Sequence, residues 1–351
     1  MYSGYMENIT VEKKEKSIVE ISGSISKDTF ESYRDEAITY LGKDYEIDGF
    51  RKGSVPKELL LKKLPEMFVL EEMAQRAIEK VYRQVLTEKE IPAIGQPKVH
   101  IKKIAAGNDL EFSLEVATIP EVKLGDYNTL VSKIEKETAQ DVTEKEIEET
   151  LLEIRKMHGH REAHGDEPHE HTEDETFDIP ELNDEFVQKL GNFKNVAEFT
   201  DKVKENLTLE KQGRAKSATR AKMVQALLDA STLEIPDMLV EYELDRFMEQ
   251  MKHDIAGMGL SYEDYLKHLT KTEEEMRNQY RIDTEKKVKT EFILAEIAKK
   301  ENITPDEVKV GEQVEGIMQA YKNVDKENVR AYVINMLQNE AVIEFLESKI
   351  K

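Results

Sequence analysis

The sequence predicts an α+β N-terminal domain followed by an all-α C-terminal domain with protruding helical arms. Apolar and polar residues alternate over residues 18–25, and residues 96–104 and 110–119 read as a further pair of segments of this kind, which predicts strands. From about residue 182 onward, apolar residues recur at steps of three and four, which is the period of a helix. A helix of about 25 residues is about 37 Å long. Several helices of this length in such a polar chain predict that some of them protrude as arms and that others pack into a compact domain.

Residues 1–118 are predicted to form the first domain. Strands are expected within residues 7–25, and a single helix over residues 28–43. Ser54 is expected to cap the next helix, because its hydroxyl can accept a backbone N–H. A longer helix is predicted over about residues 66–90, and a hairpin turn at Gly-Asn-Asp joins the two strands that follow it.

Residues 119–178 are predicted to connect the two domains. Thr143 and Glu146 have the spacing of a capping box, which predicts a helix that starts there and ends near His158. Residues 158–178 contain almost no apolar side chains and many acids and histidines. This composition indicates a flexible loop or linker.

The remaining residues, 179–351, are predicted to form the helical domain. Pro236 and Thr272 each precede a run of apolar residues at helical spacing. Residues 304–307, Thr-Pro-Asp-Glu, combine a cap, a proline for the first turn and a capping glutamate. A further helix is therefore expected to start there.

The chain is acidic, with 73 Asp and Glu against 51 Lys and Arg and a net charge of −22. Most of this charge falls after residue 120, so the N-terminal third is best able to approach an anionic partner such as RNA. The chain has no cysteine, which fits a reducing compartment. It contains neither the apolar run of a membrane span nor an apolar secretory signal at its start, so we expect a cytoplasmic protein without a membrane partner.

No catalytic pattern emerges from the sequence. Gly42-Lys43 lacks the upstream glycine of a phosphate-binding loop, and neither a Gly-x-Ser-x-Gly nor a His-Glu-x-x-His pattern occurs. The many carboxylate pairs are those expected on solvated helix faces. The sequence therefore predicts no catalytic residue and no cofactor.

Five of the eight histidines fall close together, at His158, His160, His164, His169 and His171. Imidazoles at this spacing can bind zinc, nickel or copper. A metal site also needs a rigid frame and oriented supporting groups, which this polar segment does not offer. The prediction is a solvated linker without a metal site, and weak or regulatory metal binding is the alternative left open.

An aromatic and basic cluster, GFRKGSVP, occupies residues 49–56 of this acidic chain. Gly49 and Gly53 allow backbone angles that other residues avoid, so the residues between them can stand at a loop tip. One interpretation is that Phe50 folds back into the core and the cations are ordinary surface charge. The other is a docking tip, with Phe50 as an apolar anchor and the cations facing phosphate or acidic protein.

The GFRKGSVP segment resembles the ribosome-docking signature of the trigger factor family, bacterial chaperones that meet nascent chains at the tunnel exit. The resemblance resumes in the family's order at residues 179–199, 234–251, 258–277 and 288–308. It covers most of the chain, and the later segments are similar to the family's helical domain with its two arms.

This resemblance implies a dock on the protein and rRNA of the large ribosomal subunit. Its residues would be those of the loop: Gly49, Phe50, Arg51, Lys52, Gly53 and Pro56. The family also tends to form a homodimer away from the ribosome. In the usual family pattern a prolyl isomerase domain of about 100 residues precedes the PELNDEF segment, whereas only about 20 residues stand there in this chain, too few for such a domain. We therefore expect a short form that is not an enzyme.

The resemblance further implies a client site between the arms and the N-terminal domain. Loose binding of nascent or unfolded polypeptides suits methionine, which is flexible and polarizable, and tyrosine, which is amphipathic. The residues expected to contribute are Met248, Met251, Met258, Tyr262, Tyr265, Met276, Tyr280, Met318, Tyr321 and Met336. Packing of helix on helix is the alternative for at least half of them.

The function predicted from these observations is an ATP-independent holdase that docks on the ribosome and releases its client passively. Two other classes stay open. One is a ribosome-independent holdase or export chaperone with a similar helical domain, which the docking signature counts against. The other is an isomerase, which the short linker counts against.

Overall fold

The computed structural model describes residues 9–46, 50–51, 53–164, 178–321 and 324–350. These residues form two compact units. The first combines Met1–Leu124 with Ser231–Lys299, and the second combines Gly125–Ala230 with Lys300–Lys351. The sequence predicted one uninterrupted helical domain over residues 179–351. The structure differs, because residues 231–299 pack with the N-terminal region.

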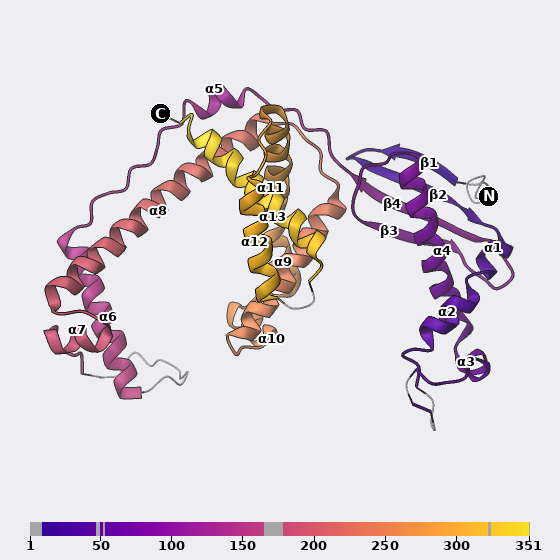
Figure 1. Cartoon of the computed structure of the whole chain (residues 1–351), viewed down its shortest axis with the longest axis horizontal. Helices are drawn as coiled ribbons and strands as arrows, with labels where there is room; N and C mark the ends of the chain where they lie inside the picture. Colours follow the sequence, from indigo (N-terminus) through magenta and orange to yellow (C-terminus); the bar gives the residue numbers. More distant parts are fainter. Residues whose placement is uncertain (1–8, 47–49, 52, 165–177, 322–323, 351) are drawn as a thin grey trace. The chain divides into compact units, whose positions relative to one another are not determined.

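The first unit contains a four-stranded antiparallel sheet in the order β1-β2-β4-β3 (Figure 1). The strands are β1 (Ile9–Lys14), β2 (Ile18–Ile25), β3 (Ala93–Lys103) and β4 (Leu110–Thr118). The predicted hairpin is confirmed, since β3 and β4 pair and Gly107 turns between them with a φ of +70°. The strand β3 starts earlier than predicted, and its register shifts between Ile94 and Lys98.

Four helices accompany this sheet: α1 (Lys27–Glu31), α2 (Arg34–Leu41), α3 (Lys57–Lys63) and α4 (Glu66–Glu88). The single helix predicted over residues 28–43 is wrong, because the chain breaks after α1. There the backbone N–H of Tyr33 bonds to the oxygen of Phe30, only three residues back, and both side chains turn into the core. The predicted cap at Ser54 is also wrong, since Pro56 is the N-cap residue of α3.

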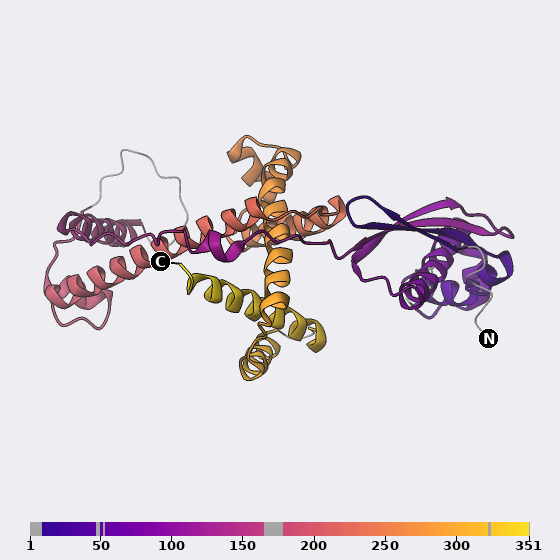
Figure 2. The ribbon, with the colours of Figure 1, turned by 90° about the horizontal axis from the view of Figure 1, so that it is seen from above.

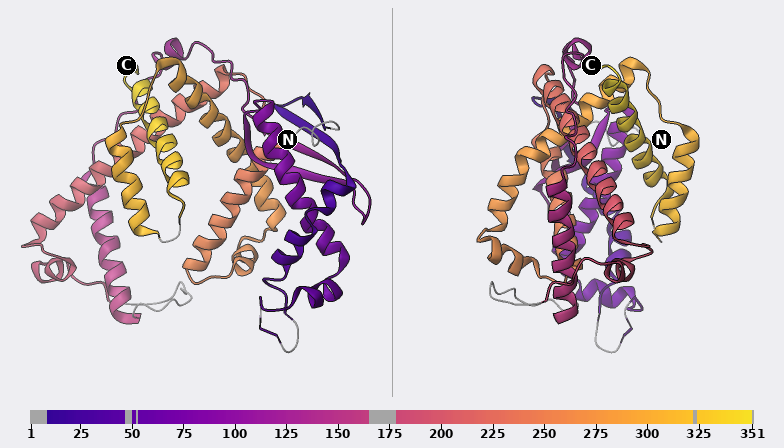
Figure 3. Two further views of the ribbon diagram at one scale, coloured as in Figure 1. Left: turned by 45° about the vertical axis from the view of Figure 1, so that its right-hand side comes forward. Right: turned by 90° about the vertical axis from the view of Figure 1, so that its left-hand side faces the viewer.

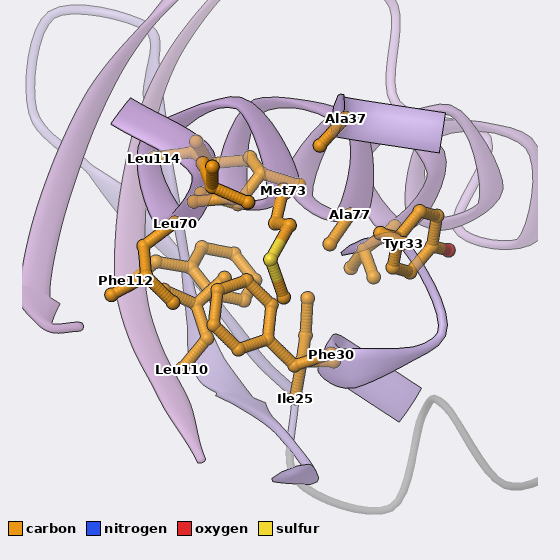
Figure 4. Close-up of a cluster of buried hydrophobic side chains, with 14 of the residues drawn as sticks. Ile25, Phe30, Tyr33, Ala37, Leu70, Met73, Ala77, Leu110, Phe112 and Leu114 are labelled. Atoms are coloured by element: carbon orange, nitrogen blue, oxygen red, sulfur yellow. The ribbon is translucent and has the colours of Figure 1, made fainter. Parts of the chain in front are cut away.

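The core of this unit lies between α4 and one face of the sheet. Figure 4 shows Met73 of α4 among Phe30 and the strand residues Leu110 and Phe112. The buried side of α4 follows the helical period and consists of Val69, Leu70, Met73, Ala74, Ala77, Ile78, Val81 and Val85. This packing fixes α4 and the helices that precede it against the sheet.

Three further helices belong to the first unit: α9 (Asp237–Gly257), α10 (Tyr262–Leu269) and α11 (Glu273–Glu301). The helix α11 begins at a capping box, in which the N–H of Thr272 donates to Glu275 at 2.8 Å and the N–H of Glu275 donates to Thr272 at 3.2 Å. The start of α9 joins the sheet through an apolar cluster of Ala117, Ile235, Leu239, Val240 and Val288.

The second unit contains α5 (Tyr127–Val131), α6 (Glu144–His164), α7 (Asp184–Leu190), α8 (Val196–Ala230), α12 (Glu307–Ala320) and α13 (Lys326–Glu347). The helices α6 and α7 pack against α8 (Figure 2). The shared core of these three helices consists of Ile147, Leu151, Phe186, Val187, Phe199 and Val203. The helix α6 continues past the predicted end at His158, whose ring packs edge-on against Phe186 with centroids 5.2 Å apart.

The helices α12 and α13 form an antiparallel pair with a core of its own, built from Val310, Val314, Val329 and Val333 (Figure 3). The helix start predicted at residues 304–307 is confirmed, but Asp306 is its cap instead of Thr304. The side chain of Asp306 accepts the N–H of Val308 at 2.8 Å. Within the described ranges, no helix is both long and apolar enough to cross a bilayer.

Candidate docking and client-binding surfaces

The loop before α3 carries an exposed aromatic side chain beside a cation. Phe50 is 41% exposed, and it stands outside the buried cluster of the first unit. Arg51 beside it is also exposed. The interpretation in which Phe50 folds back into the core is therefore wrong. Gly49 and Lys52 lie outside the described residues.

The end of this loop is fixed to the core. The N–H of Ser54 donates to the oxygen of Arg51 at 2.9 Å, which closes a turn, and Val55 is buried in the first unit's core. Gly53 has a φ of +76°. A Cβ there would meet the oxygen of Lys43 at an ordinary 3.4 Å, so the backbone angle, not a lack of space, favours glycine.

The base of the loop is held by contacts between α2 and α3. A Cβ on Gly42 would approach a methyl carbon of Leu60 to 2.5 Å, which shows how closely the two helices pack. The hydroxyl of Tyr45 donates to the oxygen of Lys63 at 2.9 Å, and Lys57 pairs with Asp35 at 2.8 Å. Phe50 and Arg51 are therefore presented from an ordered base.

Three exposed cations remain available around this loop. Arg51, Lys62 and Lys63 are exposed, and none of them takes part in an ion pair within the part of the chain that the structure describes. Lys57, by contrast, is held by Asp35. An anionic partner could therefore meet these three charges without first breaking an internal pair.

The residues predicted to bind clients on α9, α10 and α11 divide into two groups. Met248 and Met276 are each only 1% exposed and form a small core with Leu244, so their assignment to client binding is corrected to packing. Half-buried side chains surround this core: Met251, Tyr262, Tyr265 and Tyr280. Burial raises the pKa of Tyr262, and the charge of Glu273 acts in the same direction.

Other predicted client-binding residues are open to solvent. Met258 is 77% exposed and follows the last turn of α9, where Gly259 has a φ of +81°. In the second unit Tyr321 is 64% exposed, while Met318 and Met336 are half-buried.

The sequence reasoning missed two features of α9. Tyr242 is 45% exposed, and Phe247 is 43% exposed and packs against Tyr280 with centroids 4.7 Å apart. A cavity of about 530 Å³ also lies between the start of α9 and residues 95–98 of β3. No periodic signal marks either feature, because exposure depends on which neighbour covers a helix face.

The histidine-rich segment shows no metal site among the residues that are described. No group of three or more His, Cys, Asp or Glu side chains there is placed to hold an ion. His158 contributes instead to packing, and its Nδ1 lies 3.7 Å from Glu162. His169, His171 and the side chain of His164 fall outside the described residues.

Two family models match this chain. The model described as "Bacterial trigger factor protein (TF)" matches residues 7–154, and the model described as "Bacterial trigger factor protein (TF) C-terminus" matches residues 195–350. The first match contains the loop with Phe50 and Arg51. The second contains α8 to α13.

Individual relatives agree with these matches along their whole length. A trigger factor of Clostridium botulinum (strain Loch Maree / Type A3) is 22% identical over 418 residues, which cover 98% of this chain and 97% of the relative. A trigger factor of Clostridium kluyveri is 23% identical over 424 residues with the same coverage. Both aligned lengths exceed the 351 residues of this chain, so the relatives carry segments that it lacks.

A solved structure described as "Promiscuous Substrate Recognition in Folding and Assembly Activities of the Trigger Factor Chaperone" is 17% identical, with 97% of this chain and 99% of that chain covered and a TM-score of 0.48. The two family models carry the assignment, because together they account for most of the chain. The chain belongs to the trigger factor family.

Proposed function

We propose that this protein is an ATP-independent cytoplasmic chaperone that docks on the large ribosomal subunit through the loop of residues 49–56 and holds nascent or unfolded polypeptides. The observation that carries the proposal is the exposed pair of Phe50 and Arg51 on an anchored loop. Membership of a chaperone family supports the general role, and the loop supplies its specific site.

The chemistry of the loop fits a surface made of protein and RNA. A large aromatic side chain is a common anchor in a protein interface. Arg51, Lys62 and Lys63 can meet phosphates, a contact that weakens as salt rises. The acidic remainder of the chain repels RNA, so the dock is confined to this part of the first unit.

Client holding is assigned to the exposed apolar side chains of the helices. Met258 and Tyr321 are open to solvent. The half-buried residues are Met251, Tyr262, Tyr265 and Tyr280 in the first unit and Met318 and Met336 in the second. Each such contact supplies about 1 kcal/mol or less, so several together give roughly micromolar affinity and a client that can leave. Because the sequence has no nucleotide-binding motif, release is passive.

A prolyl isomerase activity is not part of this proposal. Residues 155–194 separate the two regions matched by the family models, and they include the end of α6 and all of α7. Both helices are used to pack against α8. The chain that remains between them is too short for a folded domain of typical size.

The docking proposal is tested by co-sedimentation with large ribosomal subunits. The chain is compared with a variant carrying Phe50→Ala, Arg51→Ala and Lys52→Ala. A matched control carries Arg246→Ala and Phe247→Ala, which removes the same types of side chain from α9, where Phe247 is 43% exposed. We expect the unchanged chain and the control to pellet and the loop variant to bind at least about tenfold more weakly.

Two results would contradict the docking proposal. Equal pelleting of all three proteins would mean that the loop is structural and the dock lies elsewhere. If none pellets, the chain is a holdase that works away from the ribosome.

A further inference from the structure

The strand β3 leaves one edge of the sheet open. It pairs with β4 on one side and is the last strand in the order β1-β2-β4-β3. Among the described residues, no backbone hydrogen bond joins the other side of residues 98–103 to a neighbouring segment. The N–H and C=O groups on that side are therefore available to an added strand.

One face of this edge is apolar and uncovered. Val99 and Ile101 are 47% and 43% exposed, although their partners on β4, Leu114 and Phe112, are fully buried. The apolar surface of the core thus continues onto β3, where Val99 and Ile101 remain partly exposed to solvent. An added strand that placed apolar side chains on this face would extend the core by one row.

The opposite face of the edge is basic. Lys98 and Lys102 are exposed, and neither takes part in an ion pair within the described ranges. Lys103 is held by Glu111 of β4 at 3.8 Å. Lysines on an edge strand oppose pairing with a second copy of the same basic strand, and they attract a strand that carries acids.

The start of the open edge leads into the cavity between β3 and α9. Gly95 has a φ of +70°, and a Cβ there would touch Leu239 at 3.4 Å, so α9 lies close to the beginning of β3. The cavity of about 530 Å³ reaches Lys98, where the open edge begins. Its apolar lining comes from Ile18, Pro97, Met238, Leu239 and Tyr242.

We propose that the open edge of β3, residues 98–103, binds an extended segment of unfolded polypeptide as a fifth strand. The segment has apolar side chains on the Val99 and Ile101 face and acidic side chains beside Lys98 and Lys102. The proposal rests on the holdase function proposed above and names a class of client for it. The cavity beside α9 receives an apolar side chain from one end of the segment.

Backbone pairing gives a physical reason for broad recognition. Strand addition takes most of its affinity from main-chain hydrogen bonds, which every polypeptide can form, and its preference from alternate side chains. A folded client has already paired its backbone groups, so it no longer fits the edge. Binding therefore ends when the client folds, without a nucleotide.

The test uses a fluorescent peptide of roughly ten residues in which valine and glutamate alternate, long enough to form one strand. Its binding to the full chain is measured by anisotropy. Two further peptides have the same side chains but carry N-methyl groups on alternate amides, on one edge or on the other. We expect one methylated peptide to bind like the parent and the other to lose at least about tenfold in affinity.

Variants of the chain locate the site. The pair Val99→Thr and Ile101→Thr keeps β-branched residues and is expected to weaken binding about tenfold, with an unchanged melting temperature. Lys98→Glu with Lys102→Glu should reverse the preference, so that a valine–lysine peptide binds better than the valine–glutamate peptide. Ile179→Thr makes the same kind of change at a residue that is 39% exposed, lies in no helix and is far from β3 in sequence; it is the control and should leave peptide binding unchanged.

Equal binding of both methylated peptides, or no binding of the parent peptide, would overturn the proposal. So would a concentration-dependent dimer that the Val99 and Ile101 changes abolish, since a second copy would then occupy the edge. If the variant with Val99→Thr and Ile101→Thr prevents aggregation of an unfolded protein as well as the unchanged chain does, the strand proposal fails and the holdase function stands. If the unchanged chain itself prevents no aggregation, the holdase function fails.

Discussion

Thr143 and Glu146 bind each other at the start of α6. The N–H of Thr143 donates to the Glu146 carboxylate at 2.8 Å, and the N–H of Glu146 donates to the Thr143 hydroxyl at 3.3 Å. Lys211 of α8 adds an ammonium 2.8 Å from the same carboxylate. The hydrogen bond from Lys211, followed by those from Thr143, lowers the pKa of Glu146 from its ordinary 4.5 to about 2.

This lowered pKa predicts a pH-dependent contribution to stability. Because the carboxylate is favoured in the folded state, its contribution is present above the ordinary pKa of 4.5 and is lost as the pH falls toward about 2. Glu146→Gln should lower the melting temperature at pH 7, and the difference from the unchanged chain should shrink between pH 4.5 and about 2. A difference that stays constant over this range would contradict the assignment. Glu153→Gln on the exposed side of α6 is the control.

At the scale of elements, the cluster of α9, α10 and α11 contains apolar residues that are buried and others that are exposed. Leu244, Met248 and Met276 are buried where α9 and α11 pack together. Met258 belongs to the same run of apolar residues along α9, but it lies beyond the last helical turn and has no cover. The first three hold the helices together, whereas Met258 is exposed, which is why we propose it for client binding.

Alanine substitutions should separate these two roles. Met276→Ala removes a side chain that is 1% exposed and should lower the free energy of unfolding by about 2–4 kcal/mol, through lost burial and a residual cavity. Met258→Ala should change it by less than about 0.5 kcal/mol and should weaken client binding instead. Urea unfolding of both variants checks the first effect, and binding of an unfolded polypeptide checks the second. Equal loss of stability in both variants would contradict the assignment.

At the scale of the whole molecule, the chain aligns with its relatives over nearly their full length. The alignments span 418 and 424 positions, whereas the chain has 351 residues. The alignments cover 98% of this chain and 97% of the relatives. The two family models leave only residues 155–194 between them. The chain therefore matches the family at both ends and differs in its middle.

This difference predicts that the chain does not catalyse prolyl isomerisation. The cis-to-trans relaxation of a Pro-containing peptide should proceed in the presence of the full chain at its uncatalysed rate, over tens to hundreds of seconds at 25 °C. Aggregation suppression by the same preparation serves as the control that the protein is active. A relaxation rate that rises in proportion to protein concentration would contradict the prediction.

Local patterns in the sequence determined most of the secondary structure and drew attention to the GFRKGSVP segment. Alternation, helical spacing and capping boxes depend on neighbours within a few residues, so the β3–β4 hairpin, the long helix α4 and the starts of α6 and α11 follow from them. The GFRKGSVP segment is local in the same sense. Its composition left open whether Phe50 faces the core or forms a docking tip, and the resemblance to the family favoured the dock.

Only the tertiary structure decided what is buried and what is open. The break before α2 arises because Phe30 and Tyr33 both turn into a core formed largely by distant residues. Phe50, Met258 and Met276 are all apolar, but their solvent exposure differs because a partner helix covers only Met276. The open edge of β3 has the same origin, since exposure is set by segments far apart in the chain that pack together or leave a surface uncovered.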